Sequence, residues 1–220
     1  MSESPTTRIA LLQHACGPDP AANVATCLEM IRDAAGRGAS LIMTQELFAS
    51  RYFCQTEDDA HFALAEPIPG PTSTKLSEAA KELDVTLSAS LFERRAPGLY
   101  HNTSIMVGPD GRIIDRYRKM HIPDDPRFYE KYYFTPGDLG FRAQRIDAGL
   151  HTGMLICWDQ WYPEAARLTA MKGAELLLYP TAIGWCTREA PQDRGPGTEG
   201  ETAETRTAQL EAWRTIQRSH

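Results

Sequence analysis

The chain has 220 residues and a net charge of -6, with 42% hydrophobic and 24% charged residues. This length and composition are typical of one globular domain with its own core, so we expect a single domain over residues 1–220. The acidic balance argues against a nucleic-acid-binding protein, which usually carries a basic face. It is compatible with a site that attracts a small cation.

The cysteines are odd in number, widely spaced and never arranged as C-x-x-C. This pattern argues against a disulfide framework and a zinc site, and free thiols are typical of a reducing compartment. The first residues lack the apolar segment of a secretory signal, and no apolar run approaches the roughly 20 residues that span a bilayer. We therefore expect a cytoplasmic protein without a membrane partner, a metal or another cofactor. The five cysteines are Cys16, Cys27, Cys54, Cys157 and Cys186.

A β-α-β unit is predicted at the start of the chain. Residues 8–14 favour a short buried strand, and Asp19 and Pro20 then supply a helix N-cap and a first helical residue. Apolar residues at helical spacing continue to Gly36, and residues 41–43 favour a second buried strand. This order predicts parallel strands with helices packed on the sheet.

The middle of the chain predicts one helix and three strands. The expected elements are a helix over residues 72–83 and strands over residues 85–92, 102–107 and 112–117. The tight turn Pro109-Asp110-Gly111 makes the last two strands a hairpin. Lys119 follows this hairpin, and the proline-rich residues 123–136 predict a loop with one short helical turn.

The last part of the chain repeats the strand, helix, strand order. The expected elements are an apolar strand over residues 153–157, a helix from Pro163 to Gly173, a strand over residues 176–178, a loop over residues 188–204 and a helix carrying Leu210, Trp213 and Ile216. Gly38-Ala39 and Gly173-Ala174 both separate a helix from an apolar strand. Two similar halves packed together would form two sheets face to face, with helices outside.

Three polar residues, Glu46, Lys119 and Cys157, lie where predicted strands end, which is where α/β sheets place their ligand sites. Taken singly, such a glutamate or lysine is commonly solvated and a buried cysteine is commonly inert. Together they suit covalent catalysis. The carboxylate would take the thiol proton, and the ammonium would stabilise the oxyanion that forms when the thiolate attacks a carbonyl. The Trp158 N–H is a candidate second oxyanion donor.

A cysteine–histidine pair is the alternative catalytic set. His121 lies two residues after Lys119 and would point to the other face of a continued strand. His151 precedes Cys157 by six positions, which is too far along a strand for local contact. A papain-like pair is therefore the less favoured reading of this sequence.

Three segments contain the candidate residues: Thr44-Gln45-Glu46-Leu47-Phe48, Arg116-Tyr117-Arg118-Lys119-Met120-His121 and Leu155-Ile156-Cys157-Trp158-Asp159. Their order and context resemble the nitrilase (carbon–nitrogen hydrolase) superfamily. The resemblance implies an α/β fold that is a four-layer α-β-β-α sandwich. It also implies Glu46 as general base, Lys119 as oxyanion stabiliser and Cys157 as nucleophile. The segment from Tyr129 to Asp138 is similar to the family's second-glutamate loop, so Glu130 would position Lys119 and the substrate.

Within the superfamily, residues 50–55, 157–164 and 179–185 are similar to N-carbamoylputrescine amidases. This resemblance implies hydrolysis of the terminal ureido group of N-carbamoylputrescine to putrescine, CO2 and ammonia, in polyamine biosynthesis. Related enzymes for N-carbamoyl amino acids hold a carboxylate with arginines at the positions of Gln160 and Trp161. Without such a cation, a substrate carboxylate would be a costly unpaired buried charge.

The implied substrate is therefore a small cationic ureido compound. Aromatic and acidic side chains suit an alkylammonium through cation–π and ion-pair contacts. The expected substrate-binding residues are Tyr52, Trp158, Thr181, Trp185 and Glu189, with Asp193 as the alternative acid for the distal amine. Both acids are equally compatible with a solvated loop.

Members of the superfamily usually continue past the helix near Ile216 with strands that complete the second sheet and a segment used in assembly. The resemblance thus predicts a truncated chain with an incomplete second sheet, and a homo-oligomer formed through the family's dimer face. Two alternatives stay open. The substrate would be another N-carbamoyl amine, an N-carbamoyl β-amino acid or an ω-amide, or the chain would be a non-catalytic remnant that binds other subunits.

Overall fold

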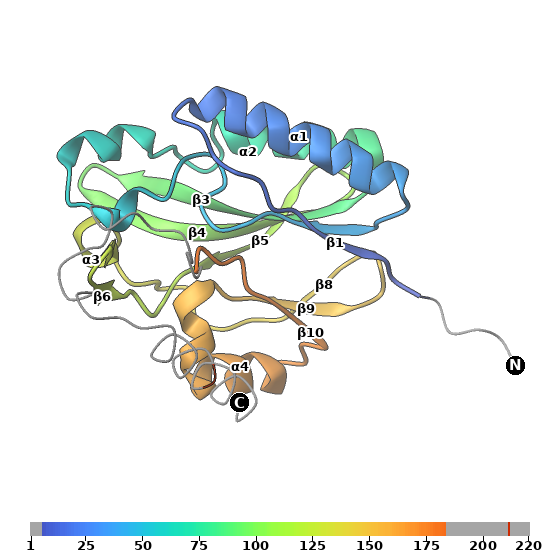
Figure 1. Ribbon diagram of the computed structural model, residues 1–220. Coiled ribbons are helices and arrows are strands. Elements are labelled where there is room, and N and C mark those ends of the chain that lie inside the picture. Colours follow the sequence, from blue (N-terminus) through green and yellow to red (C-terminus); the bar gives the residue numbers. More distant parts are fainter. Residues whose placement is uncertain (1–5, 184–210, 212–220) are drawn as a thin grey trace, which may run out of the picture.

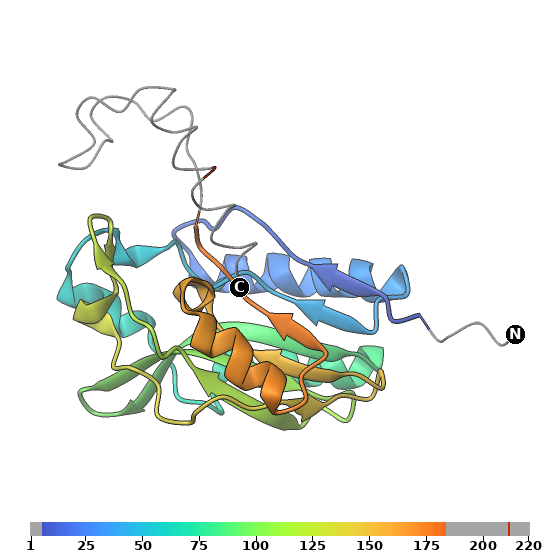
Figure 2. The same cartoon turned by 90° about the horizontal axis from the view of Figure 1, so that it is seen from below.

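Residues 6–183 and Glu211 are described by a computed structural model of the protein. Two β-sheets lie face to face, with α1 (Pro20–Gly36) and α2 (Pro71–Leu83) outside one sheet and α4 (Pro163–Met171) outside the other (Figure 1). In the view turned by 90°, α4 lies in front of the sheets (Figure 2). The predicted α/β fold with layers in the order α-β-β-α is confirmed.

The first sheet has five strands in the order β1-β2-β3-β4-β5. Its strands are β1 Ile9–Leu11, β2 Leu41–Met43, β3 Thr86–Ala96, β4 Leu99–Val107 and β5 Ile113–Arg118. The helical crossovers α1 and α2 make β1, β2 and β3 parallel. Short turns join β3, β4 and β5, so these three strands are antiparallel. The hairpin expected at Pro109-Asp110-Gly111 is confirmed.

The second sheet pairs three strands in the order β10-β9-β8 among the described residues. They are β8 Gln144–Arg145, β9 His151–Met154 and β10 Leu176–Leu178. The crossover through α4 makes β9 and β10 parallel, as α1 does for β1 and β2. Gly38 and Gly173 occupy the same place in the two units, with φ of 84° and 96°. Both φ values lie in the left-handed region that glycine adopts readily at helix ends.

Side chains alternate between two cores along the central strands. Ile42 on β2 and Ile105 on β4 lie in the core beneath α1 and α2. Their neighbours Leu41 and Met106 lie in the core between the two sheets, because successive side chains of a strand point to opposite faces. This second core also contains Cys157, so the predicted nucleophile is buried between the sheets.

Short elements complete the described chain. They are the 3-10 helices Phe53–Gln55, Asp59–Leu64 and Cys157–Trp161, the strands β6 Asp124–Asp125 and β7 Phe128–Tyr129, and α3 Glu130–Tyr133. The helical turn expected within residues 123–136 is therefore α3. The ring of Phe53 lies 5.0 Å from those of Phe92 and Tyr133. These aromatic contacts pack α3, which begins with Glu130, against β3.

Three details differ from the sequence predictions. The strand at residues 8–14 is expected to be buried, but Leu11 is 69% exposed, because it points to the face opposite Ala10 and Leu12, and the described residues leave it uncovered there. The strands β3 and β4 extend beyond their expected ranges into a hairpin, whose turn contains Gly98 at a φ of 73°. The strand expected over residues 153–157 ends at Met154, since the backbone turns at Cys157 to a φ of 42°.

The loop predicted over residues 188–204 lies outside the described residues. So do Leu210, Trp213 and Ile216 of the last predicted helix, although Glu211 within it is helical. In the described part of the chain, no helix combines the length and the apolar composition that a membrane span requires.

Gly137 lies against the backbone that carries Lys119. Its N–H donates to the Lys119 carbonyl at 2.8 Å, and a Cβ added to it would lie 1.9 Å from the Arg118 carbonyl oxygen. We expect Gly137→Ala to lower the free energy of unfolding by about 1–3 kcal/mol, because overpacking forces the backbone to shift. Urea unfolding measures the change. Gly36→Ala is the control, since no atom lies within 4 Å of its added Cβ, and equal losses in the two variants would contradict the expectation.

Candidate active site

The ammonium of Lys119, directly after β5, lies between two carboxylates. Its Nζ is 2.9 Å from Glu46 Oε1 and 2.7 Å from Glu130 Oε2, and all three side chains are at most 1% exposed. Burial alone would lower the pKa of Lys119, but the charges of Glu46 and Glu130 outweigh it and raise this pKa well above its ordinary value. Lys119 therefore stays a cation and is unsuited to act as the base.

Glu46, at the end of β2, accepts three hydrogen bonds. Its Oε1 accepts from Lys119 Nζ and from Asn102 Nδ2 at 2.8 Å, and its Oε2 accepts from the Ala182 N–H at 2.7 Å. A carboxylate oxygen has two lone pairs, so both positions on Oε1 are used and one position on Oε2 remains. Among the described residues, Oε2 is therefore the Glu46 oxygen that has room to accept a further proton or hydrogen bond.

Glu130 begins α3 and connects Lys119 to the pocket wall. Its Oε2 accepts from Lys119 Nζ, and its Oε1 accepts from the Tyr52 hydroxyl at 2.7 Å. Burial raises the pKa of Glu130 to about 7, with Lys119 opposing the rise and Glu46 adding to it. Glu130 is therefore only partly ionised near neutral pH, and its ion pair with Lys119 becomes complete as the pH rises above about 7.

Cys157 is 4% exposed and is the first residue of the 3-10 helix after β9. Burial raises the pKa of its thiol well above the ordinary value; Glu46 adds to the rise, while Lys119 and the Ala182 N–H oppose it. The thiol therefore interacts electrostatically with Glu46, Lys119 and Glu130. Because the thiol is protonated at rest, it would need a base to become a nucleophile.

The two candidate histidines, His121 and His151, have other partners. His121 Nδ1 lies 2.7 Å from Asp159 Oδ1, and its ring stacks on Tyr162 with centroids 3.8 Å apart. His151 lies 3.5 Å from Glu175. The described residues thus contain no hydrogen bond that would make a cysteine–histidine pair with Cys157.

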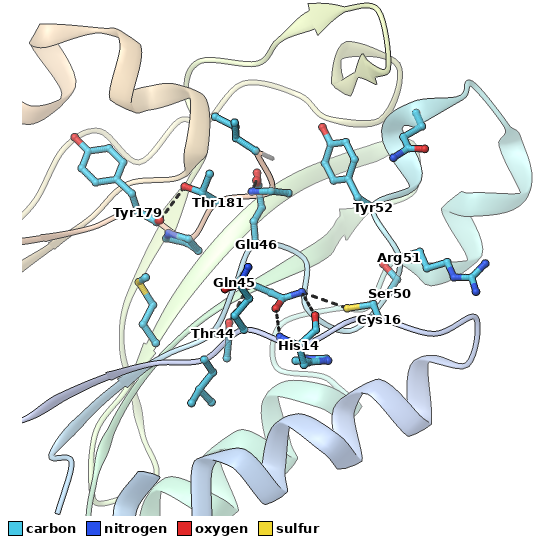
Figure 3. Close-up of a pocket in the computed structure, with 17 residues that line it drawn as sticks. His14, Cys16, Thr44, Gln45, Glu46, Ser50, Arg51, Tyr52, Tyr179 and Thr181 are labelled. Carbon is cyan, nitrogen blue, oxygen red and sulfur yellow. Dashed lines mark hydrogen bonds between the residues drawn. The ribbon is translucent and has the colours of Figure 1, made fainter. Parts of the chain in front are cut away.

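A pocket of about 650 Å³ opens beside Glu46. Glu46, Tyr52 and Thr181 come from separate segments of the chain and border the same space (Figure 3). On another side of the pocket, Gln45 hydrogen-bonds the backbone of His14. The lining also includes Arg51, so the described wall contains a cation as well as the carboxylate of Glu46.

The structure places the predicted substrate-binding residues as follows. Tyr52 and Thr181 line the pocket. Trp158 packs edge-on against Tyr162, with ring centroids 5.4 Å apart, and its contact with substrate stays a prediction. Trp185, Glu189 and the alternative acid Asp193 lie outside the described residues. Within the described part, His, Cys, Asp and Glu side chains form no group of three that is arranged to hold a metal ion.

Two groups of the site were not identified from the sequence. Asn102 is fully buried in β4, and its Oδ1 accepts from the Ser90 hydroxyl at 3.1 Å while its amide donates to Glu46. A fully buried amide needs partners, so an asparagine at the start of a predicted strand was the available signal. Ala182 acts through its backbone N–H, which side-chain chemistry does not reveal.

The fold and the site define a class of protein, an α/β sandwich with a buried Glu-Lys-Cys set. The sequence profile of the carbon-nitrogen hydrolase family matches residues 8–213. The chain belongs to this family.

Individual relatives refine the comparison. The N-carbamoylputrescine amidase of Solanum lycopersicum is 46% identical over 188 residues, which are 85% of this chain and 61% of that protein. The citrullinase of Francisella tularensis is 43% identical over 178 residues, 80% of this chain and 62% of that protein. The chain therefore spans about three fifths of the length of these curated relatives.

Solved structures agree with this assignment. A carbon-nitrogen hydrolase from Helicobacter pylori superimposes with a TM-score of 0.84 at 43% identity, covering 96% of this chain and 68% of that one. An amidase from Nesterenkonia superimposes with a TM-score of 0.72 at 26% identity, covering 82% of this chain and 66% of that one. That amidase structure carries the acetamide moiety of fluoroacetamide covalently added at its active site cysteine.

Tyr52→Phe tests the link between the pocket wall and the charged residues. The variant loses a hydrogen bond that favours ionised Glu130, so the pKa of Glu130 rises above about 7. If ionised Glu130 is needed to hold Lys119, activity increases with pH through this pKa. We expect the acidic limb of kcat/KM to move to higher pH by about one pH unit. Tyr133→Phe is the control, because its hydroxyl donates to the Thr56 carbonyl instead. An unmoved limb in Tyr52→Phe would contradict this role.

Proposed function

We propose that the chain hydrolyses the terminal ureido group of N-carbamoylputrescine to putrescine, CO2 and ammonia, a step in polyamine biosynthesis. The observation that carries this proposal is the buried Lys119 ammonium between Glu46 and Glu130, next to the buried Cys157 thiol. The substrate assignment draws support from N-carbamoylputrescine amidases that are 43–46% identical to this chain.

The proposed reaction begins with proton transfer from Cys157. The thiol is protonated at rest and Glu46 Oε2 has an unused acceptor position, so Glu46 takes the proton as the sulfur attacks the ureido carbon. The carbonyl oxygen becomes an oxyanion, which Lys119 stabilises without losing its own proton. A backbone donor such as the Trp158 N–H would share this charge.

Collapse of the tetrahedral intermediate completes the first half of the proposed reaction. The carbon–nitrogen bond breaks, and the leaving nitrogen takes the proton that Glu46 had received from the thiol. Glu46 then takes a proton from water, and the hydroxide attacks the thioester carbon. The carbon–sulfur bond breaks to release a carbamic acid, and Cys157 takes back the proton that Glu46 received from water, so the enzyme returns to its first state. The carbamic acid then breaks its remaining carbon–nitrogen bond and gives CO2 and the second amine product.

The residues around the pocket indicate which charged group the substrate carries at the end away from its ureido group. Gln160 and Trp161 follow the Cys157-Trp158-Asp159 segment and supply no cation there, which favours a substrate without a carboxylate at that point. Arg51 in the pocket lining supports a second candidate, a ureido amino acid whose carboxylate would pair with the guanidinium. The 43% identity to a citrullinase supports the same alternative.

Cys157→Ala tests the nucleophile. We expect ammonia release from N-carbamoylputrescine to fall by about 10⁴-fold or more, because a methyl group offers no lone pair for attack. Thermal denaturation of both proteins shows that the loss is chemical and not a loss of fold. Release at the parent rate would exclude the proposed scheme, and a parent chain without any activity would support the non-catalytic remnant.

A comparison of three ureido compounds tests the substrate. N-carbamoylputrescine ends in an ammonium, N-carbamoyl-β-alanine ends in a carboxylate, and citrulline carries both groups. We expect the highest kcat/KM for N-carbamoylputrescine, since a substrate carboxylate has no partner beside Gln160 and Trp161. Equal or better hydrolysis of N-carbamoyl-β-alanine would refute the polyamine assignment. A preference for citrulline that Arg51→Gln removes would establish the second candidate.

A further inference from the structure

Asp159 is a fully buried carboxylate for which the proposed reaction has no role. It lies two residues after Cys157, and it accepts hydrogen bonds from three separate places in the chain. Its Oδ2 accepts from the Ile156 N–H at 2.9 Å and from the Tyr117 hydroxyl at 2.8 Å. Its Oδ1 lies 3.1 Å from the His121 backbone nitrogen and 2.7 Å from His121 Nδ1. A buried charge with so many partners is costly to remove or to mispair.

The bonds to Oδ2 act on the turn that contains the nucleophile. Cys157 has a φ of 42°, in the left-handed region that a residue with a Cβ rarely adopts. Such a conformation costs about 1–3 kcal/mol and persists only where its surroundings hold it. Asp159 Oδ2 holds the Ile156 N–H immediately before the strained residue. Gln160 Nε2, which donates to the Cys157 carbonyl at 2.8 Å, supports the other side.

The bonds to Oδ1 act on the segment that contains the ammonium. His121 lies two residues after Lys119, at the point where the chain leaves β5. Its ring is fixed from the other side by stacking on Tyr162, which directly follows the 3-10 helix. Asp159 therefore joins the Lys119 segment of the first sheet to the Cys157 turn of the second sheet through one rigid side chain.

We propose that Asp159 is a positioning residue that sets where the Cys157 thiol lies relative to Lys119 and Glu46. A misplacement of about 1 Å at a reacting atom can cost about 100-fold in rate, so the loss of this connection reduces catalysis even when the protein still folds. The inference rests on the proposed function for its kinetic readout. A second readout, the alkylation of Cys157 by iodoacetamide, does not need the ureido substrate.

The experiment compares Asp159→Ala with Asp159→Asn. The alanine variant loses every bond to the carboxylate. The asparagine variant keeps one oxygen for the Ile156 N–H and the Tyr117 hydroxyl. Its NH2 group faces His121, where it can donate to Nδ1 but no longer accepts from the backbone N–H. Thr169→Val is the matched control, because Thr169 is equally buried, lies on α4 and donates to the Ala165 carbonyl at 2.7 Å. Each protein is titrated with iodoacetamide and mass spectrometry, so that kcat is given per reactive thiol.

We expect kcat per reactive thiol to fall by about 100-fold in Asp159→Ala, with KM within about threefold of the parent value. The alkylation rate of Cys157 should fall with it, by about tenfold or more. Asp159→Asn should retain kcat within about tenfold of the parent, and Thr169→Val should lower Tm without lowering kcat. A merely structural role would lower Tm and the fraction of reactive thiol in Asp159→Ala but leave kcat per thiol unchanged, which would overturn the proposal.

The experiment also decides the proposal if a variant does not fold or if the parent chain is inactive. If Asp159→Ala does not fold, Tyr117→Phe decides, because it removes only one donor to Oδ2, and unchanged kcat and alkylation rates would overturn the proposal. If the parent chain does not hydrolyse the ureido substrate, the proposed function is refuted but the role of Asp159 is not. Alkylation still tests Asp159 in that case, and equal rates in parent and Asp159→Ala would overturn its role.

Discussion

The ammonium of Lys119, held between the carboxylates of Glu46 and Glu130 and out of reach of water, is the interaction on which the site depends. Buried charges are tolerated only when they are paired, so each of these three residues stabilises the others. Removing one of them would leave a buried charge unpaired and would destabilise the protein. Their balance leaves Lys119 a permanent cation and raises the pKa of Glu130 to about 7. The same charges act on the Cys157 thiol, which is protonated at rest. In the proposed reaction, the carboxylate of Glu46 activates this thiol.

Each of the two sheets supplies part of this arrangement. The first sheet presents Glu46 after β2 and Lys119 after β5, and its buried Asn102 occupies a position on Glu46 Oε1. The second sheet presents Cys157 after β9 and the Ala182 N–H after β10. Neither sheet alone contains base, cation and nucleophile, so the packing of the sheets forms the site. The proposed connection through Asp159 crosses the same boundary and would keep the two parts in register.

Local signals in the sequence predicted most of the elements. Asp19 caps α1, Gly38 and Gly173 end helices in the left-handed conformation, and the Pro109-Asp110-Gly111 turn forms the expected hairpin. These features depend on a few neighbouring residues. The strand predicted over residues 153–157 is present as β9, but its end was misplaced because an apolar run is equally compatible with a strand and with a buried turn. The exposure of Leu11 was also missed, since it depends on what covers that face of β1 and not on the strand's own residues.

By itself, the sequence determined the order of the longer helices and strands, and the presence of Glu46, Lys119, Glu130 and Cys157 in segments that resemble one family. Periodicity, caps and turns are short-range properties, and they can be read from adjacent residues. Only the tertiary structure decided that Lys119 bonds Glu46 across 73 positions, that the Ala182 N–H reaches Glu46 across 136 positions, and that His121 pairs with Asp159 and not with Cys157. Such contacts arise when separate elements pack to bury apolar surface and to satisfy every buried polar group at once, a condition on the whole chain that no local segment contains.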